Sequence, residues 1–153
     1  MSKLNIGLTG DLKRQLQQFE EKLQNEVLTG AVAAGARVLY NELLIQVPVA
    51  KGVLKSSVYR YMDRETEKQP KRTYFVGINM AEAPHWWLVE YGHMETFKPY
   101  KGKDGKWYTS TVPWPQPRFV PGTPYLRPTA TKMSEALEAV KVRFAEKIKE
   151  LSK

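Results

Sequence analysis

The sequence predicts an α+β fold, built as a single domain over residues 1–153. Near both ends of the chain, apolar residues recur every three or four positions, which is the period of a helix packed on one side. Between these ends, residues 73–78 are rich in β-branched and aromatic side chains, as strands are. A chain of 153 residues is also long enough to bury one hydrophobic core.

The first predicted element is a helical region over residues 8–46. Its apolar stripe consists of Leu8, Leu12, Leu16, Phe19 and Leu23. Thr9 or Asp11 can cap its start. Residues 30–36 are small and include two glycines, each of which costs about 1 kcal/mol against alanine, so we expect another backbone to pack closely there. The pattern fits one long helix or two helices joined near Asn25 to Gly30.

Pro48 ends the helical region, because the residue before a proline is driven out of helical geometry. A turn over 47–52 follows. An antiparallel sheet under the helices is predicted from three stretches, namely residues 53–62, 73–79 and parts of 86–114. Residues 63–72 are highly charged and include a proline, which is typical of an exposed connection between strands.

The central stretch, residues 85–93, combines three aromatic residues with one carboxylate, Glu90, before Gly92 breaks it. Residues 93–123 are then dense in Gly, Pro, Lys and aromatic residues, with a turn at 101–106. The five prolines from Pro99 to Pro121 exclude a central strand. We therefore expect this stretch to form a projecting basic arm or hairpin.

The last predicted element is a helix over residues 124–151, where apolar residues step by three or four throughout. Two starts fit the sequence. Thr123 can cap a helix whose first residue is Pro124. Alternatively, residues 124–127 form a turn and Pro128 begins the helix. The sequence favours neither start.

Composition limits the classes of protein to consider. The chain has no cysteine, which excludes disulfides and thiolate metal sites and fits folding in a reducing cytoplasm. Residues 1–20 lack the pattern of a signal peptide. No segment approaches the roughly 18 apolar residues that a membrane span needs. We expect a soluble protein without a membrane partner.

The net charge of +8 is concentrated in two segments, 51–72 and 95–128, each of which contributes +4. A basic surface of this kind suggests an acidic protein partner or nucleic acid. A solvated basic surface with no partner explains the charge equally well.

Catalytic and metal-binding patterns were sought in the same way. His85 and His93 bracket Glu90, but this spacing matches no metal motif, and no acidic cluster lies nearby. The chain lacks a glycine-rich phosphate loop, a nucleophile elbow and a carboxylate pair in an apolar setting. We therefore expect no enzymatic activity, no metal and no cofactor.

The arm supplies the candidate interface residues, which are Trp107, Tyr108, Trp114, Lys101, Lys103 and Lys106. Aromatic side chains among lysines can stack on unpaired nucleic-acid bases. Trp and Tyr are also favoured where one protein subunit packs on another. The subunit interface is the preferred interpretation, and contact with nucleic acid is the alternative.

Three motifs occur in order along the chain. The first is Val47-Pro48-Val49 followed by Lys51-Gly52-Val53-Leu54-Lys55-Ser56-Ser57, the second is Trp87-Leu88-Val89-Glu90-Tyr91-Gly92-His93, and the third is Pro124-Tyr125-Leu126-Arg127-Pro128-Thr129-Ala130. In this order and at this length, they resemble the tail-completion, or head–tail joining, family of long-tailed double-stranded DNA phages and prophages. The matching positions are Pro48, Gly52, Leu54, Glu90, Tyr91, Gly92, Pro124, Leu126, Arg127 and Pro128.

The sequence departs from the family pattern at three places. His93 stands where the family usually has Thr, and Thr129 delays the alanine that follows the second proline. The arm between the second and third motifs is also long and rich in Trp. These departures concern the local interface chemistry.

The resemblance implies a non-enzymatic structural protein at the joint between filled head and tail, present as a ring of copies. It would be made in the host cytoplasm and found in the virion, in the tail or neck. Its implied partners are other tail and neck proteins, namely the connector, the tail terminator or the tail tube. Non-specific contact with DNA is a further expectation.

One contact is predicted between the second and third motifs. Glu90 lies in an apolar segment, where an unpaired carboxylate is costly to bury. Arg127 is the obvious partner, since a guanidinium holds a carboxylate with two parallel hydrogen bonds. The alternative is that Glu90 faces solvent and Arg127 meets water or another subunit.

Overall fold

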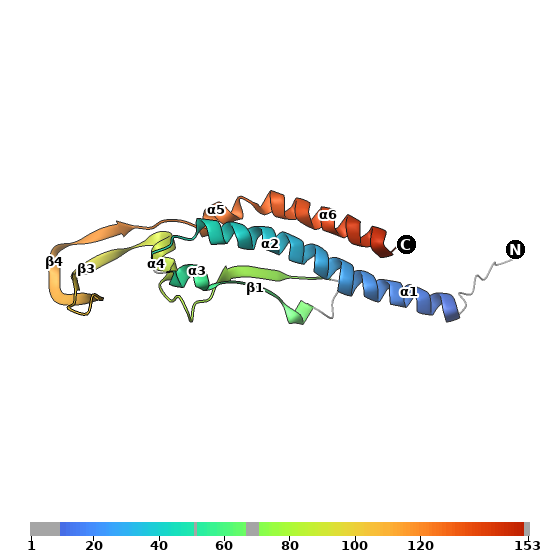
Figure 1. The fold of residues 1–153 in the computed structure, drawn as a ribbon, viewed down its shortest axis with the longest axis horizontal. Coiled ribbons are helices and arrows are strands. Elements are labelled where there is room, and N and C mark those ends of the chain that lie inside the picture. The colour runs from blue at the N-terminus through green and yellow to red at the C-terminus, as the bar shows by residue number, and fades with distance from the viewer. Residues whose placement is uncertain (1–9, 51, 67–70, 152–153) are drawn as a thin grey trace, which may run out of the picture. The chain divides into compact units, whose positions relative to one another are not determined.

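The computed structural model describes residues 10–50, 52–66 and 71–151. It confirms the predicted α+β class, with helices and two antiparallel two-stranded sheets (Figure 1). The chain divides into two compact units. The helical unit comprises Met1–Asn41, Arg60–Val76 and Lys132–Lys153, and the hairpin unit comprises Glu42–Tyr59 and Gly77–Thr131. The single domain stays a prediction.

The predicted N-terminal helical region is continuous through its described part. Helix α1 (Gly10–Lys22) leads into a π-helical segment, η1 (Leu23–Leu28), and then into α2 (Thr29–Gln46). Lys22 and Thr29, which flank η1, both have right-handed helical backbone angles. The joint expected near Asn25 to Gly30 is therefore a widened turn within one helix. Asp11 lies in the first turn of α1, whereas Thr9 lies outside the described residues.

The π-helical segment is held from outside by a buried arginine. Arg72 donates hydrogen bonds to the side chains of Asn25, at 2.7 Å, and Thr29, at 3.1 Å. It is only 8% exposed, so the prediction of an exposed connection over 63–72 is wrong at this residue. Arg72 turns inward because two polar side chains of η1 and α2 satisfy its guanidinium. Residues 67–70 of that connection lie outside the described part.

Close packing, which the small residues at 30–36 predict, is found at Gly35 of α2. A Cβ at Gly35 would lie 2.6 Å from a methyl carbon of Val140 and 2.9 Å from the backbone oxygen of Ala136, both in α6 (Met133–Leu151). Only glycine allows α2 and α6 to approach this closely. Gly30 has no such neighbour, so packing does not explain it.

The predicted sheet differs from the observed one. Strand β1 (Val58–Met62) pairs with β2 (Tyr74–Ile78), but residues 53–56 form a short helix, α3 (Val53–Ser56), in place of a strand. Gly52, with a φ of 79°, starts this helix. The side chain of Ser57 donates to the carbonyl of Leu54, which completes the turn.

The central stretch is also helical. Residues Trp86–Tyr91 form α4, so they add no strand to the first sheet. The β-structure after α4 is a separate hairpin of β3 (Gly92–Lys101) and β4 (Trp107–Pro121), which confirms the hairpin expected for the arm. Its turn falls within the predicted 101–106. All five prolines are accommodated because a two-stranded ribbon has only edge strands.

The predicted C-terminal helix is two helices, α5 (Leu126–Ala130) and α6. The break falls at Thr131 and Lys132, where the amide of Thr131 bonds to the carbonyl of Pro128. Neither predicted start is right, because α5 begins at Leu126 with Tyr125 as its N-cap. Among the described residues, no helix is long and apolar enough to cross a membrane.

Candidate assembly interface

The base of the hairpin is fixed by a buried carboxylate. Glu90, on α4, is 2% exposed, and its Oε2 accepts hydrogen bonds from the backbone amides of Tyr125 (2.7 Å) and Leu126 (3.0 Å). These amides open α5 and have no partner within their own helix. Glu90 therefore caps a helix that lies 35 residues further along the chain. Its second oxygen, Oε1, is buried and has no hydrogen-bond partner among the described residues.

The predicted pairing of Glu90 with Arg127 is wrong. Arg127 is exposed, and its guanidinium carbon lies 5.5 Å from the ring centre of Tyr91. The alternative that Glu90 faces solvent is wrong as well. Backbone amides satisfy one oxygen of this carboxylate without a second charge, because both N–H groups at the start of α5 donate to Oε2. The second and third motifs therefore meet through the backbone and not through an ion pair.

Tyr125 completes the junction. Its side chain is fully buried, and its hydroxyl donates to the carbonyl of Trp86 at 3.0 Å. Burial, together with the nearby charge of Glu90, raises the pKa of Tyr125 to about 12. The hydroxyl of Thr129 in turn donates to the carbonyl of Tyr125 at 2.7 Å. The third motif is thus held at its start by α4.

Two glycines allow the chain to enter and leave the hairpin through one narrow space. Gly92 has a φ of +81°, and a Cβ there would lie 2.5 Å from the carbonyl oxygen of Val120. A Cβ at Gly122 would lie 2.5 Å from the amide nitrogen of Gly92. The amide of Thr123 also bonds to the carbonyl of Val89 at 2.7 Å. Side chains are excluded from both glycine positions.

The first two motifs and the segment just before the third line an apolar hollow of about 330 Å³ within the hairpin unit. Its walls come from the first motif, from α4 and from the segment before the third motif, and they are Pro48, Ala50, Gly52, Val53, Leu54, His85, Val89 and Thr123. The predicted motif residues Pro48, Gly52 and Leu54 are thereby brought together with the neighbours of Glu90 and Pro124. Among its described lining residues there is no carboxylate or amine, and the polar side chains are the His85 imidazole and the Thr123 hydroxyl.

The hairpin itself leaves many large apolar side chains exposed. Figure 1 shows it running away from α3, α4 and α5 of the same unit. The exposed apolar side chains along its two strands are Met94, Phe97, Tyr100, Trp107, Tyr108, Val112 and Phe119. Met94 pairs directly with Phe119, so these two side chains lie together on one face. Exposed apolar side chains grouped in this way can serve as a contact surface for another molecule.

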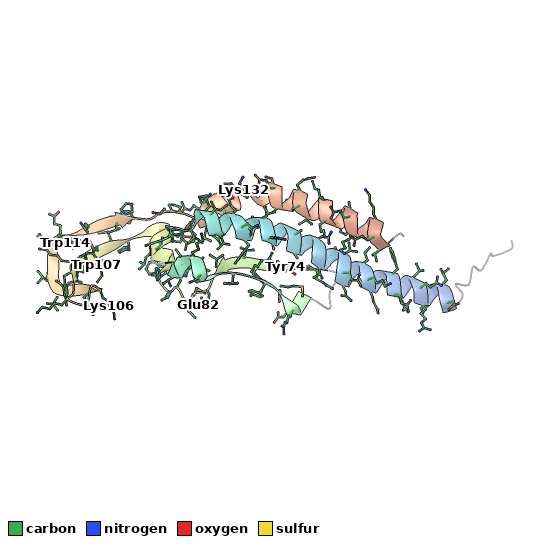
Figure 2. All side chains as sticks on the ribbon, in the orientation of Figure 1. Tyr74, Glu82, Lys106, Trp107, Trp114 and Lys132 are labelled. Atoms are coloured by element: carbon green, nitrogen blue, oxygen red, sulfur yellow. The ribbon has the colours of Figure 1, made fainter. Side chains whose placement is uncertain are left out.

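The candidate residues at the tip differ in how free they are. Figure 2 labels Lys106, Trp107 and Trp114 in the half of the hairpin remote from α4. Trp107 is 61% exposed and lies opposite Lys101 in the ladder. Lys101, Lys103 and Lys106 are exposed and have no ion pair among the described residues. Trp107 and the three lysines are therefore available to a partner.

Tyr108 and Trp114 are already engaged within the hairpin. The hydroxyl of Tyr108 donates to Asp104 at 2.6 Å, which lowers the pKa of Asp104 and raises that of Tyr108. Tyr108 also stacks on Tyr100, with ring centres 5.7 Å apart. Trp114 is half-buried, with the Arg118 guanidinium carbon 4.6 Å and the Lys98 amine 5.2 Å from its ring centre. These contacts shape the hairpin and reduce what either ring offers to a ligand.

No sequence pattern singles out Gly122, Tyr125 or Arg118 as functional. Gly122 has a structural role only because Gly92, thirty residues earlier, packs against it. Arg118 has one because it forms an ion pair with Glu95 across the ladder. Cross-strand partners follow from register, and two register shifts separate the base of this hairpin from its tip. The available signal for Tyr125 was its place inside the third motif.

Groups that could support chemistry were sought throughout the described residues. There, no cluster of three or more His, Cys, Asp or Glu side chains could hold a metal ion. Comparison with protein-family models, with curated proteins and with solved structures gave no match to this chain. The candidate site is therefore defined by its own geometry, as a hairpin with a fixed base and an exposed surface.

Proposed function

We propose that this protein is a non-enzymatic structural protein of a long-tailed phage or prophage. In this role it completes the tail or neck at the head–tail joint, as one copy in an oligomeric ring, and so is part of the virion. Two lines support the proposal. The order of the three motifs resembles the tail-completion family, and those motifs build the junction that holds the hairpin.

The observation that carries the proposal is the contrast between the hairpin's base and its surface. At the base, Glu90 and the two glycines fix where both strands begin and end. Beyond the base, Met94, Phe119 and Trp107 are exposed without a partner of their own unit to cover them. A firmly held element with exposed aromatic and aliphatic side chains is suited to docking, because little conformational entropy is lost on binding.

The same surface indicates the chemistry of the partner. Lys101, Lys103 and Lys106 make the hairpin turn basic, so the partner surface should be acidic around an apolar centre. The prolines of β4 also limit pairing with a further strand, since proline cannot donate to a ladder. Side-chain contacts, and not strand addition to β4, would then join the hairpin to the connector, tail terminator or tail tube.

Contact with nucleic acid is the second candidate function. One observation favours it, namely that Trp107 is exposed next to three unpaired lysines at the hairpin turn. Binding to nucleic acid gives no role to the apolar pair of Met94 with Phe119 at the other end of the hairpin. Protein contact accounts for both ends of the hairpin and is preferred.

The decisive experiment is electron microscopy of the protein mixed with purified tails or connectors. A ring of protein at one end of the tail is expected. Protein that binds nowhere on tails and connectors would contradict the proposal.

Matched variants locate the contact on the hairpin. Trp107→Ser should abolish binding to tails while leaving the thermal unfolding unchanged, because the side chain is exposed. Trp87→Ser is the control, since Trp87 is an exposed tryptophan on α4 of the same unit. Equal binding by both variants would show that the hairpin is not the docking surface.

Salt dependence separates the two candidate functions. A protein that neutralises several phosphates loses about a thousandfold or more in affinity for random duplex DNA between 50 and 200 mM salt. We expect weak DNA binding, with tail binding that survives 200 mM salt. Tight, steeply salt-dependent DNA binding without tail binding would favour the second candidate.

A further inference from the structure

Helix α1 carries an apolar stripe that no described residue of its own unit covers. Every residue from 11 to 22 is exposed, and the stripe consists of Leu12, Leu16 and Phe19. Their spacing of four and three residues places these side chains on one face of the helix. Leu16, at the centre, is 53% exposed. An amphipathic helix of this kind gains its stability by burying such a stripe on a partner.

The same helical unit contains an apolar groove that is open to solvent. The groove has a volume of about 390 Å³ and lies between α2, β2 and α6. Phe75, Met133 and Leu137 are exposed members of its lining, and Leu137 is 54% exposed. Tyr74, on the strand side of the groove, is labelled in Figure 2. The groove is therefore a second uncovered apolar surface in this unit.

The stripe and the groove match in length. The stripe runs from Leu12 to Phe19, and the part of α6 that lines the groove runs from Met133 to Val140. Each span covers seven residue steps, which is about 10.5 Å at the rise of an α-helix.

The stripe cannot reach the groove of its own copy. Helix α1 continues through η1 into α2, with helical backbone angles on both sides of η1. Leu16 and Gly35 are therefore separated along one helix axis by about 28 Å, at 1.5 Å per residue. Folding α1 back onto the groove would break the helix at the segment that Arg72 holds. The stripe on α1 can therefore enter only the groove of another copy.

Charge points to a second copy of this chain and not to nucleic acid. Helix α1 has three basic and three acidic residues, so the flanks of its stripe are neutral overall. Lys132, just before α6, pairs with Glu135 of that helix, and Lys141 pairs with Glu138 within it. Two neutral, apolar surfaces of equal length suit each other and offer nothing to a phosphate backbone.

We propose that α1 of one copy docks its Leu12–Leu16–Phe19 face into the α2–β2–α6 groove of the next copy. The contact is heterologous, because each copy gives one surface and receives the other. Such contacts close into a ring when the rotation between copies allows it. The inference rests on the proposed function only for the closure of the copies into a ring. The contact between two copies can be tested in the free protein.

A single contact of this kind should be weak. A helix of 13 residues is about 20 Å long and buries a few hundred Å² on its partner, less than the roughly 800 Å² per partner of a stable complex. Copies would therefore join in a concentration-dependent way and persist in a ring, where each copy makes two contacts. Trapping the contact covalently avoids dependence on its strength.

Disulfide trapping tests the contact directly, because the chain has no cysteine of its own. Leu16→Cys and Leu137→Cys are placed in separate copies that differ in mass by a tag, and the two are mixed under mild oxidation. These positions are the centres of stripe and groove, so they meet whichever way the helix lies. We expect a disulfide-linked dimer containing one copy of each kind, and a ladder of longer products from the double variant Leu16→Cys/Leu137→Cys.

Two controls keep the result specific. Gln17→Cys lies about 100° around the axis of α1 from Leu16 and should link to Leu137→Cys about tenfold less, because a disulfide needs Cβ atoms within about 4.5 Å. Leu16→Cys alone should not link to itself, which distinguishes groove docking from a pair of α1 helices. No linkage above the Gln17→Cys control would overturn the proposal, and so would a product confined to Leu16→Cys with itself.

A second readout does not depend on cysteine chemistry. Leu16→Glu and Leu137→Glu each change an exposed residue, so circular dichroism should stay that of the parent protein. Each should remove the larger species that the parent forms in sedimentation at high concentration. A parent protein that stays monomeric and gives no linkage would contradict the inference. A disulfide ladder without any protein on tails would instead contradict the proposed function and leave the inference standing.

Discussion

The junction around Glu90 and the hairpin that follows it are held in different ways. At the junction, every strand entry and helix start is determined by a contact with a distant residue, through the Glu90 carboxylate or through Gly92 and Gly122. The hairpin is held by its own ladder and by local contacts such as Tyr108 with Asp104. Most of its large side chains remain exposed.

This difference separates residues that build the protein from residues that are available to a partner. The motif positions Glu90, Gly92 and Leu126 belong to the junction and specify how the hairpin is anchored. Trp107 and the lysines of the turn belong to the second class. Changes at the junction should therefore alter stability, and changes on the hairpin should alter binding.

The largest loss of stability is expected at the crossing of the two glycines. Gly92→Ala places a methyl group 2.5 Å from the carbonyl oxygen of Val120 at a φ of +81°. We expect a loss of more than about 3 kcal/mol in the free energy of unfolding, from the clash and the backbone strain together. Urea denaturation measures the loss.

Gly105→Ala on the hairpin turn is the matched control. Its φ of +77° is similar, but a Cβ there meets nothing within 4 Å. Only the left-handed strain remains, so the expected cost is about 1 kcal/mol. Equal losses at the two glycines would show that the junction is not the tighter region.

The next largest effect concerns the buried carboxylate. Glu90→Ala leaves the amides of Tyr125 and Leu126 without an acceptor, which should cost about 3 kcal/mol. Glu90→Gln keeps one acceptor oxygen but no charge and should cost less, about 1–2 kcal/mol. Arg127→Met should cost no more than about 1 kcal/mol, since an exposed cation–π contact is weak. Thermal unfolding of the three variants tests this order.

A double-mutant cycle sharpens the same point. Because Glu90 caps a backbone and does not pair with Arg127, the effects of Glu90→Gln and Arg127→Met should add within about 0.5 kcal/mol. A coupling clearly larger than this would restore the ion pair that the sequence suggests.

A smaller effect should appear at high pH. The pKa of Tyr125 in the folded protein, about 12, lies above its ordinary value of 10.0, so the folded state holds this proton longer than the unfolded state. The stability that the protonated Tyr125 hydroxyl gives the folded state is complete below pH 10. It is lost as pH rises from 10 towards 12. Tyr125→Phe should therefore lose less stability over this interval than the parent protein. Parallel curves for the two proteins would mean that Tyr125 does not carry this pH dependence.

The smallest effect on stability is expected at the hairpin turn. Lys101 and Trp107 face each other in the ladder, so an Asn-Gly pair can replace residues 102–106 as a two-residue turn. The free energy of unfolding should change by no more than about 0.5 kcal/mol, because the replaced residues carry no apolar anchor. Tail binding, followed by electron microscopy, should fall. If the variant binds tails normally, the contact lies outside the turn. If the variant unfolds, the turn is needed for the stability of the hairpin unit.

The sequence by itself determined the features that depend on near neighbours. The period of apolar residues predicts the N-terminal helical region and the course of α6, and the composition of 93–123 predicts a hairpin with its turn. The glycine and alanine run predicts the close approach that Gly35 makes to α6. In each case, the information lies within one or two turns of the residue concerned.

Only the tertiary structure decided the partners of buried polar groups and the breaks between elements. Glu90 and Arg127 are chemically suited to an ion pair. In the structure, however, the Glu90 carboxylate accepts hydrogen bonds from two backbone amides that lie 35 and 36 residues further along the chain. The same capping fixes the start of α5 at Leu126. The two local signals, a cap at Thr123 and a first helical residue at Pro128, both predict another start. A buried charge is satisfied by whichever donors the fold places beside it, and no spacing along the chain records that choice.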